Sequence, residues 1–170
     1  TRRSGGMHYT SIENIHKVID PLFLDGLKAE LEEIRKIPVE RTRKQKLEAF
    51  QQKLAGLTFL DPACGSGNFL TETYLSLRRL ENQVLALLHN NQIVFDVGNP
   101  IQVSIGQFYG IEINDFAVTV AKTALWIAES QMMKETEDVV HMSLDFLPLK
   151  SYANIVEGNA LRLDWEDVVP

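Results

Sequence analysis

A glycine-rich loop follows a short apolar segment, and its residues are suited to holding a cofactor. Asp61-Pro62-Ala63-Cys64-Gly65-Ser66-Gly67 comes directly after Thr58-Phe59-Leu60. Glycine lets the main chain approach a ligand closely, and a helix that begins after the loop offers N–H groups to a negative group. The loop is not a P-loop, because no Gly-Lys-Ser/Thr follows, and the dinucleotide fingerprint fails because Leu70 replaces its third glycine. Many α/β turns carry Gly-x-Gly for steric reasons, so the loop alone identifies no cofactor.

Polar residues also follow two later apolar segments. Glu112 ends the first of these, where a carboxylate can accept both ribose hydroxyls of a nucleoside and Ile113 can cover its purine. Asn159 follows the second, where an amide can pair with the polar edge of a purine. Each also has an ordinary interpretation, Glu112 as an exposed acid and Asn159 as a turn residue. If the segments are consecutive parallel strands, all three tips share the edge where open α/β sheets bind ligands.

The elements that would position these residues alternate between strand and helix. This pattern predicts an α/β fold with a parallel sheet, joined to an irregular segment over 90–107 and a loop-rich segment over 135–152. The expected elements are a strand at 58–60, a helix at 68–89, a strand at 108–113, a helix at about 115–134 that carries Phe116, Val120, Ala124, Ile127 and Ala128, and a strand at 154–157.

The residues before the loop predict helices. Thr10 and Glu13 could form a capping box at the start of the first helix, and Asp20-Pro21 could cap and restart a second. Pro38 is expected to begin a third helix that ends near Gly56. Charges of mixed sign along this stretch are typical of a solvated helical hairpin. We therefore divide the chain into an N-terminal helical segment, 1–56, and an α/β part, 57–170.

Composition excludes several classes of protein. Cys64 is the single cysteine, so no internal disulfide can form, and the four histidines show no metal-ligand spacing. No apolar run is long enough to span a membrane. These features favour a cytoplasmic protein without a metal site. A formal charge of −6 places most contacts to any nucleic acid outside this chain, because such surfaces are normally basic.

Four segments, in order, resemble the motifs of S-adenosylmethionine (SAM)-dependent amino-methyltransferases that act on DNA. Asp61–Leu70 looks like their first motif, Gly6–Thr10 the motif that precedes it, Phe108–Asn114 the second and Gly158–Leu161 the third. With Ile19–Phe23, the combination is most similar to prokaryotic type IIG (MmeI-like) restriction–modification enzymes. The resemblance implies a Rossmann-like class I SAM methyltransferase fold, present in part with about three parallel strands.

The resemblance also implies a role for each matching residue. Tyr9 and Thr10 would close over the methionine end of SAM. Glu112 would bind the ribose, Ile113 would pack on the adenine, and Asn159 would take the adenine amino group, although relatives often carry Asp there. The other residues expected to bind SAM, which shape the loop or add main-chain contacts, are Asp61, Ala63, Gly65, Gly67 and Ala160.

The implied reaction is methyl transfer from SAM to the amino group of adenine in double-stranded DNA. Its catalytic Asn/Asp-Pro-Pro-aromatic tetrapeptide is not found in the sequence, since Asn99-Pro100-Ile101 lacks the second proline and the aromatic. We expect it within about 30 residues after Pro170, given usual connection lengths. No catalytic residue is therefore assigned to 1–170, and this segment alone is expected to bind SAM weakly or not at all. Cys64 has no evident base partner and is interpreted as structural.

Other functions remain open at this point. Amino-methyltransferases that act on RNA or on protein glutamine share the implied fold, and a non-catalytic SAM-fold module would carry the same cofactor motifs. A nicotinamide-dependent oxidoreductase is disfavoured, because the third glycine is missing and Glu112 lies far beyond the position of the expected acid.

Overall fold

The computed structural model describes residues 9–89, 99–141 and 152–170. Residues 6–8 of the segment that resembles a motif lie outside this part. So do 90–98 and 142–151, which belong to the stretches 90–107 and 135–152 that we predicted to be irregular or loop-rich. The elements, in order, are α1 (Ile12–Ile19), the π-helical turn η1 (Asp20–Leu24), α2 (Asp25–Arg35), α3 (Glu40–Gly56), β1 (Phe59–Asp61), α4 (Asn68–His89), the 3₁₀ turn η2 (Ile105–Gln107), β2 (Phe108–Glu112), α5 (Asp115–Val140), β3 (Asn154–Glu157) and α6 (Trp165–Val168).

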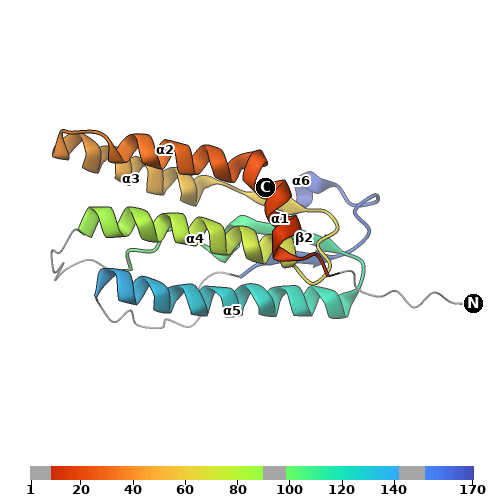
Figure 1. Cartoon of the computed structure of the whole chain (residues 1–170). Coiled ribbons are helices and arrows are strands. Elements are labelled where there is room, and N and C mark those ends of the chain that lie inside the picture. Colours follow the sequence, from red (N-terminus) through yellow and green to blue (C-terminus); the bar gives the residue numbers. More distant parts are fainter. Residues whose placement is uncertain (1–8, 90–98, 142–151) are drawn as a thin grey trace, which may run out of the picture.

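The three strands form one parallel sheet in the order β1-β2-β3. Asp61 pairs with Gly110, and Glu112 pairs with Glu157. Because the strands are parallel, their carboxyl ends meet at one edge, where α1, α6 and the start of α5 also lie (Figure 1). This confirms the predicted α/β fold with three parallel strands and an N-terminal helical segment.

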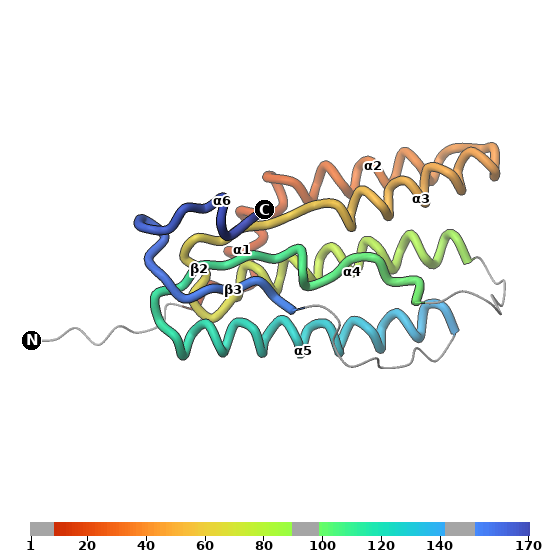
Figure 2. The backbone as a smooth tube through the Cα atoms, turned by 180° about the vertical axis from the view of Figure 1, so that it is seen from behind, coloured from red at the N-terminus to blue at the C-terminus, as the bar shows by residue number. Residues whose placement is uncertain are grey.

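Two long helices cover one face of the sheet. Helices α4 and α5 connect successive strands and pack on each other and on β2, whereas α3 packs beside α4 (Figure 2). The core between these layers includes Leu77, Val84 and Leu125, all fully buried. The Phe108 ring stacks on Phe59 and meets the edge of Tyr74 of α4. These contacts fix β1 and β2 on α4, and with them the loop that joins β1 to α4. No helix in the described residues is long and apolar enough to cross a membrane.

The N-terminal helices differ in detail from the prediction. Ser11, not Thr10, caps α1, because its hydroxyl accepts a hydrogen bond from the Asn14 amide at 3.3 Å. At Asp20-Pro21 the helix does not restart, but continues into α2 through η1, in which the Asp25 amide donates to the Asp20 carbonyl. Leu22 points outward from this turn and is 73% exposed. Helix α3 begins at Glu40, two residues after Pro38, and ends at Gly56 as predicted.

Helix α5 is longer than the predicted helix and runs to Val140. The expected loop from residue 135 was therefore wrong at its start. Thr136 is fully buried near the end of α5, and its hydroxyl donates to the side chain of Asn82 on α4 at 2.7 Å. The helix buries Ala121, Leu125 and Ala128 but leaves Phe116 66% exposed. Its apolar residues therefore lie on more than one face.

Candidate functional site

The loop between β1 and α4 is held in place by main-chain and carboxylate hydrogen bonds. The Asp61 carboxylate accepts from the Ala63 amide at 3.0 Å, and the Cys64 amide donates to the Ile111 carbonyl of β2 at 3.1 Å. Gly65 and Gly67 have positive φ angles of 54° and 82°, which favour glycine. The amides of residues 63, 64, 65 and 67 thus already donate to acceptors within the protein. These four loop amides are therefore not free to bind the negative group that we expected at the start of the following helix.

A side chain on Gly67 would also lack space. A Cβ atom there would lie 2.9 Å from the Cβ of Ala121 and 3.1 Å from its Cα. The loop therefore packs directly against the backbone of α5. Close contact between loop and helix is the steric use of glycine that makes Gly-x-Gly common in α/β turns.

Glu112 joins the tip of β2 to the loop. One carboxylate oxygen accepts from the Gly65 amide at 2.9 Å, and the other accepts from the Asn114 amide at 3.0 Å. An ionised carboxylate offers about four lone-pair sites, so each oxygen of Glu112 can still accept another hydrogen bond. The side chain is only half-buried. It is therefore fixed by the protein and still able to accept from a ligand.

Asn159 follows β3 in a turn that packs against the tip of β2. The Gly158 amide donates to the Glu112 carbonyl at 2.9 Å, and the Asn159 side-chain oxygen accepts from the Leu161 amide at 3.0 Å. Asn159 thus serves as a turn residue, the ordinary interpretation of its position, and its turn lies beside Glu112. Its role as a turn residue is therefore compatible with a position at the predicted ligand site.

These tips surround a single cavity of about 470 Å³. Among the residues expected to bind a cofactor, Ala63, Glu112, Ile113, Asn159 and Ala160 line it. Asp61, Gly65 and Gly67 shape the loop beside it without lining it. Sequence reasoning missed the other lining residues, which are Pro62, Ile111, Gly158, Leu161 and Trp165.

Trp165 is the most informative of the residues missed. It begins α6, is 45% exposed, and its indole N–H donates to the Ala160 carbonyl at 2.8 Å. This bond holds a large aromatic surface beside the cavity. The chain reverses direction between β3 and Trp165, and the sequence does not reveal this reversal. The signal that the sequence offered was an isolated tryptophan soon after the third strand.

Two groups at this edge, the Asp61 carboxyl and the Cys64 thiol, have raised pKa values. Burial is the main cause that raises the pKa of Asp61, and the charge of Glu112 adds to it, whereas the Ala63 amide opposes it. Burial, together with the same two carboxylates, raises the pKa of the Cys64 thiol to about 12. Cys64 is therefore an unreactive thiol, in agreement with its structural interpretation.

Tyr9 and Thr10 begin the described part of the chain, just before α1. Tyr9 is 73% exposed and Thr10 half-buried, and neither lines the cavity. Helix α1, which they precede, lies at the carboxyl end of the sheet (Figure 1). Their role at the cofactor stays a prediction.

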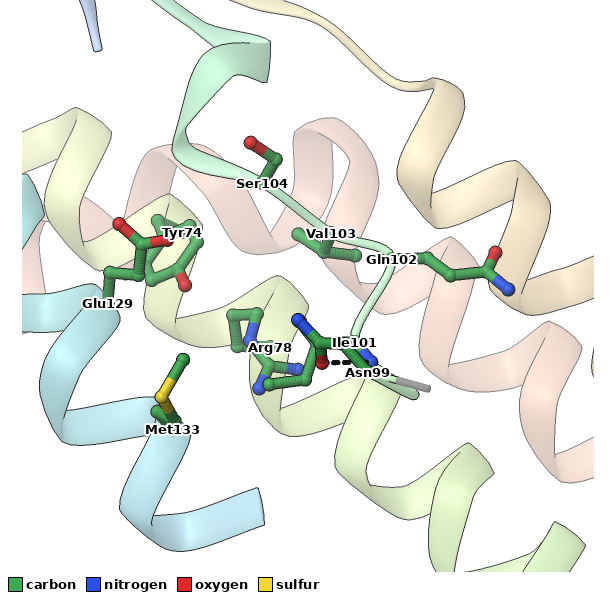
Figure 3. Close-up of a pocket in the computed structure, with 9 residues that line it drawn as sticks. All are labelled: Tyr74, Arg78, Asn99, Ile101, Gln102, Val103, Ser104, Glu129 and Met133. Atoms are coloured by element: carbon green, nitrogen blue, oxygen red, sulfur yellow. Dashed lines mark hydrogen bonds between the residues drawn. The ribbon is translucent and has the colours of Figure 1, made fainter. Parts of the chain in front are cut away.

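A second, smaller cavity of about 110 Å³ lies between α4, α5 and the segment 99–104 (Figure 3). Arg78 is fully buried there, and its guanidinium donates to Glu81, to Asn82 and to Thr136 of α5. Glu81 also accepts from the Gln102 and Val103 amides. These bonds fasten the segment that leads into β2 to both long helices.

The fold and the carboxyl-edge cavity together define an open α/β domain with its candidate ligand site at the tips of parallel strands. The sequence model of one family, described as "MmeI, DNA-methyltransferase domain", matches residues 37–170. The chain belongs to this family, which confirms the resemblance found in its motifs.

Individual relatives agree with this assignment. DNA methyltransferase A of Bacillus subtilis (strain 168) is 43% identical over 166 residues, which are 97% of this chain and 18% of that protein. A putative type II restriction enzyme and methyltransferase of Methanocaldococcus jannaschii is 33% identical over 82 residues, or 48% of this chain and 7% of that protein.

A solved structure of the type IIL restriction–modification enzyme MmeI in complex with DNA matches the fold. It has a TM-score of 0.86 and 47% identity, and the match covers 95% of this chain and 21% of that one. The chain thus spans about a fifth of the length of MmeI and of the Bacillus relative.

Proposed function

We propose that this chain forms the SAM-binding part of a DNA methyltransferase that modifies the amino group of adenine, in a restriction–modification or related defence system. In this proposal residues 57–170 are the first half of the SAM-binding α/β domain, and 1–56 are the helical segment before it. One observation carries the proposal: Glu112, the glycine loop and the Asn159 turn surround one cavity in a chain of a DNA-methyltransferase domain family.

The residues at the cavity fit the nucleoside half of SAM. Both oxygens of Glu112 are fixed and can still accept, as a ribose with two hydroxyl donors requires. Exposed Ile113 provides an apolar surface for a purine face, and the amide of Asn159 suits a purine's polar edge. The cavity volume of about 470 Å³ lies within the usual range of about 300–1,000 Å³ for ligand sites.

The charge of the cavity edge fits the methionine half. Asp61 is a partly buried carboxylate whose pKa is raised by burial and by Glu112. A cation beside it would relieve this unfavourable charge, because an opposite charge favours the ionised form. SAM carries a sulfonium and an ammonium group, and when bound it supplies an activated methyl group. Asp61 and the loop would hold its amino-acid end, with Tyr9 and Thr10 nearby.

DNA would be held mainly by regions other than this chain. The chain carries a net charge of −6, whereas DNA affinity depends on neutralising phosphates. The related MmeI structure is a complex with DNA, and this chain matches only 21% of that protein. The catalytic tetrapeptide, Asn-Pro-Pro followed by Tyr or Phe, is likewise assigned to sequence outside 1–170. We place the whole enzyme in the bacterial or archaeal cytoplasm.

SAM binding by the full-length gene product tests the cofactor site. Calorimetry should show that Glu112→Ala weakens SAM affinity by roughly 100-fold or more, because two charge-assisted hydrogen bonds to the ribose are lost. Glu157→Ala is the matched control, since Glu157 pairs with Glu112 in the sheet but is exposed and does not line the cavity. Equal affinities of wild type and Glu112→Ala would show that Glu112 does not bind the ribose.

Product analysis tests the reaction. The full-length gene product is incubated with SAM carrying a tritiated methyl group and, in separate reactions, with double-stranded DNA, RNA or protein. The labelled nucleosides or amino acids are separated after digestion. We expect label in N6-methyladenine, and none with Glu112→Ala. Label in methylcytosine, in RNA or in a protein glutamine would replace the adenine assignment. SAM binding without transfer to any of these substrates would favour a non-catalytic module.

A further inference from the structure

His16 bridges two helices by placing one carboxylate on each of its ring nitrogens. Nδ1 lies 2.7 Å from Asp20 Oδ1, four residues along the same helical stretch, and Nε2 lies 2.8 Å from Glu72 Oε1 of α4. Arg79, also on α4, approaches the same Glu72 oxygen at 3.9 Å. These three are the charged groups that face His16 from η1 and α4. The imidazole thus links α1 to α4 through hydrogen bonds.

The position of Glu72 connects this bridge to the candidate SAM site. Glu72 is buried and lies on the second turn of α4, the helix that begins at Asn68 directly after the glycine loop. The first turn is continuous with that loop, because the Thr71 amide donates to the Gly67 carbonyl at 2.8 Å. At the other end of the bridge, His16 lies on the second turn of α1. Tyr9 and Thr10 directly precede this helix and its cap.

The bridge requires the charged form of histidine. Both ring nitrogens donate only in the imidazolium ion, and ionised carboxylates only accept. The hydrogen bond with Asp20 is the largest cause that raises the pKa of His16 above its ordinary value of 6.5, and the bond with Glu72 follows. The link is therefore complete below pH 6.5 and is lost as the pH rises through the raised pKa of the folded protein.

We propose that His16 is a positioning residue for SAM: its bridge from Asp20 to Glu72 holds the start of α1, and thereby Tyr9 and Thr10, in register with the glycine loop. The inference rests on the proposed SAM site. Helix α1 is also anchored by buried Ile15 and Ile19, so loss of the bridge should leave α1 folded but free to shift. His16 acts on SAM through Tyr9 and Thr10 and is not itself a catalytic residue.

SAM affinity of the full-length gene product tests this role at pH 6.5, by calorimetry without DNA. His16→Ala and Glu72→Ala should each weaken SAM binding by roughly three- to tenfold, because each removes the partly exposed charged hydrogen bond that joins α1 to α4. The double variant should lose no more than either single variant, because both break one bridge. The control Lys17→Ala changes the adjacent exposed residue, whose ammonium group contacts exposed Glu13 and exposed Asn14, and should bind SAM like wild type.

The pH profile separates positioning from a general loss of stability. Wild-type SAM affinity should be highest near pH 6.5 and fall as the pH rises through the raised pKa of His16, relative to His16→Gln, which cannot carry the charge. The comparison with His16→Gln removes any titration of SAM itself. A merely structural His16 would lower the melting temperature of its variants and leave both SAM affinity and the difference between the two profiles unchanged.

Failure of this proposal is distinct from failure of the proposed function. If wild type binds no SAM, the SAM site is wrong. If wild type binds SAM and the folded His16 and Glu72 variants bind it equally well at every pH, the site stands and the positioning role is refuted. Additive losses in the double variant would likewise refute the single bridge.

Discussion

Glu81 and Glu112 each hold main-chain amides, and their surroundings differ. Glu81, in the interior between α3, α4 and the segment 99–104, accepts from the Gln102 and Val103 amides and from the side chains of Arg78 and Gln51. Glu112, at the carboxyl edge of the sheet, accepts from the Gly65 and Asn114 amides. In the described part of the chain, no lysine or arginine forms an ion pair with Glu112.

The difference separates a structural carboxylate from one available to a ligand. Glu81 is fully buried with its cation and has four partners, so its capacity to accept is used up within the fold. Glu112 is half-buried, has two partners and lines an open cavity. A buried charge is stable only when it is paired, whereas a carboxylate at a cavity edge can complete its bonding with a ligand. Stability should thus depend on Glu81 and SAM affinity on Glu112.

The largest expected effect is on the stability of the interior cluster, which consists of Glu81 and its partners Arg78, Gln51, Gln102 and Val103. Glu81→Ala leaves the Arg78 charge buried and unpaired, which should cost about 3–5 kcal/mol. Hydrogen exchange of the α4 amides, followed by mass spectrometry on the full-length gene product, measures this loss locally. Glu32→Ala breaks the exposed pair with Arg35 and should change stability by less than about 1 kcal/mol. If the two variants lose similar amounts, the interior cluster is not structural.

The next effect is steric: a side chain added at Gly110 of β2 should displace the loop between β1 and α4. A Cβ atom on Gly110 would lie 2.8 Å from Cys64 Sγ and 3.1 Å from Leu70 Cδ1, so Gly110→Ala should cost about 1–3 kcal/mol and weaken SAM binding by moving the loop. Gly26→Ala is the control, because nothing lies within 4 Å of its Cβ. Adding Cys64→Ala to Gly110→Ala should restore part of the loss, as melting and SAM calorimetry would show. No restoration would mean that the contact with Cys64 is not the cause.

The smallest expected effect is on stability at the carboxyl edge of the sheet, where Asp61 lies near Glu112. The pKa of Asp61 is raised in the folded protein, so its contribution to stability is complete below pH 3.8 and is lost as the pH rises through the raised value. Asp61→Asn avoids this loss and should be slightly more stable than wild type near neutral pH, by less than about 1 kcal/mol. The same variant should bind SAM less well. Unfolding of both proteins is measured from acidic to neutral pH, and the prediction is contradicted if Asp61→Asn is the less stable protein at neutral pH.

The sequence predicted the elements that carry the cavity because their signals are local. The helix after the loop has its predicted bounds, 68–89, and the third strand its predicted bounds, 154–157. Short apolar runs followed by Asp61, Glu112 and Gly158-Asn159 suffice for the strand tips. Family membership, fold and the meeting of the three tips at one edge were all accessible in this way.

Other features depend on contacts between distant residues and could not be predicted. Helix α5 continues past 134 because Thr136 bonds to Arg78 and Asn82, which lie more than 50 positions earlier. The far wall of the cavity forms because the chain turns back after Gly158, whose amide bonds to Glu112, and brings Leu161 and Trp165 over it. At the start of α1, Thr10 and Ser11 are adjacent and both suited to capping, so local preference could not choose between them.

The π-helical turn at Asp20–Leu24 sets the rotational phase between α1 and α2. A π turn accommodates one more residue than an α-helical turn, which is equivalent to an insertion of about 100° around the helix axis. Deletion of exposed Leu22 would convert the stretch into a continuous α-helix and turn α1 by that angle relative to α2. Ile15, Ile19 and His16 would then leave α4 together. A one-residue change in length here would thus have a greater effect than most substitutions in the same helix.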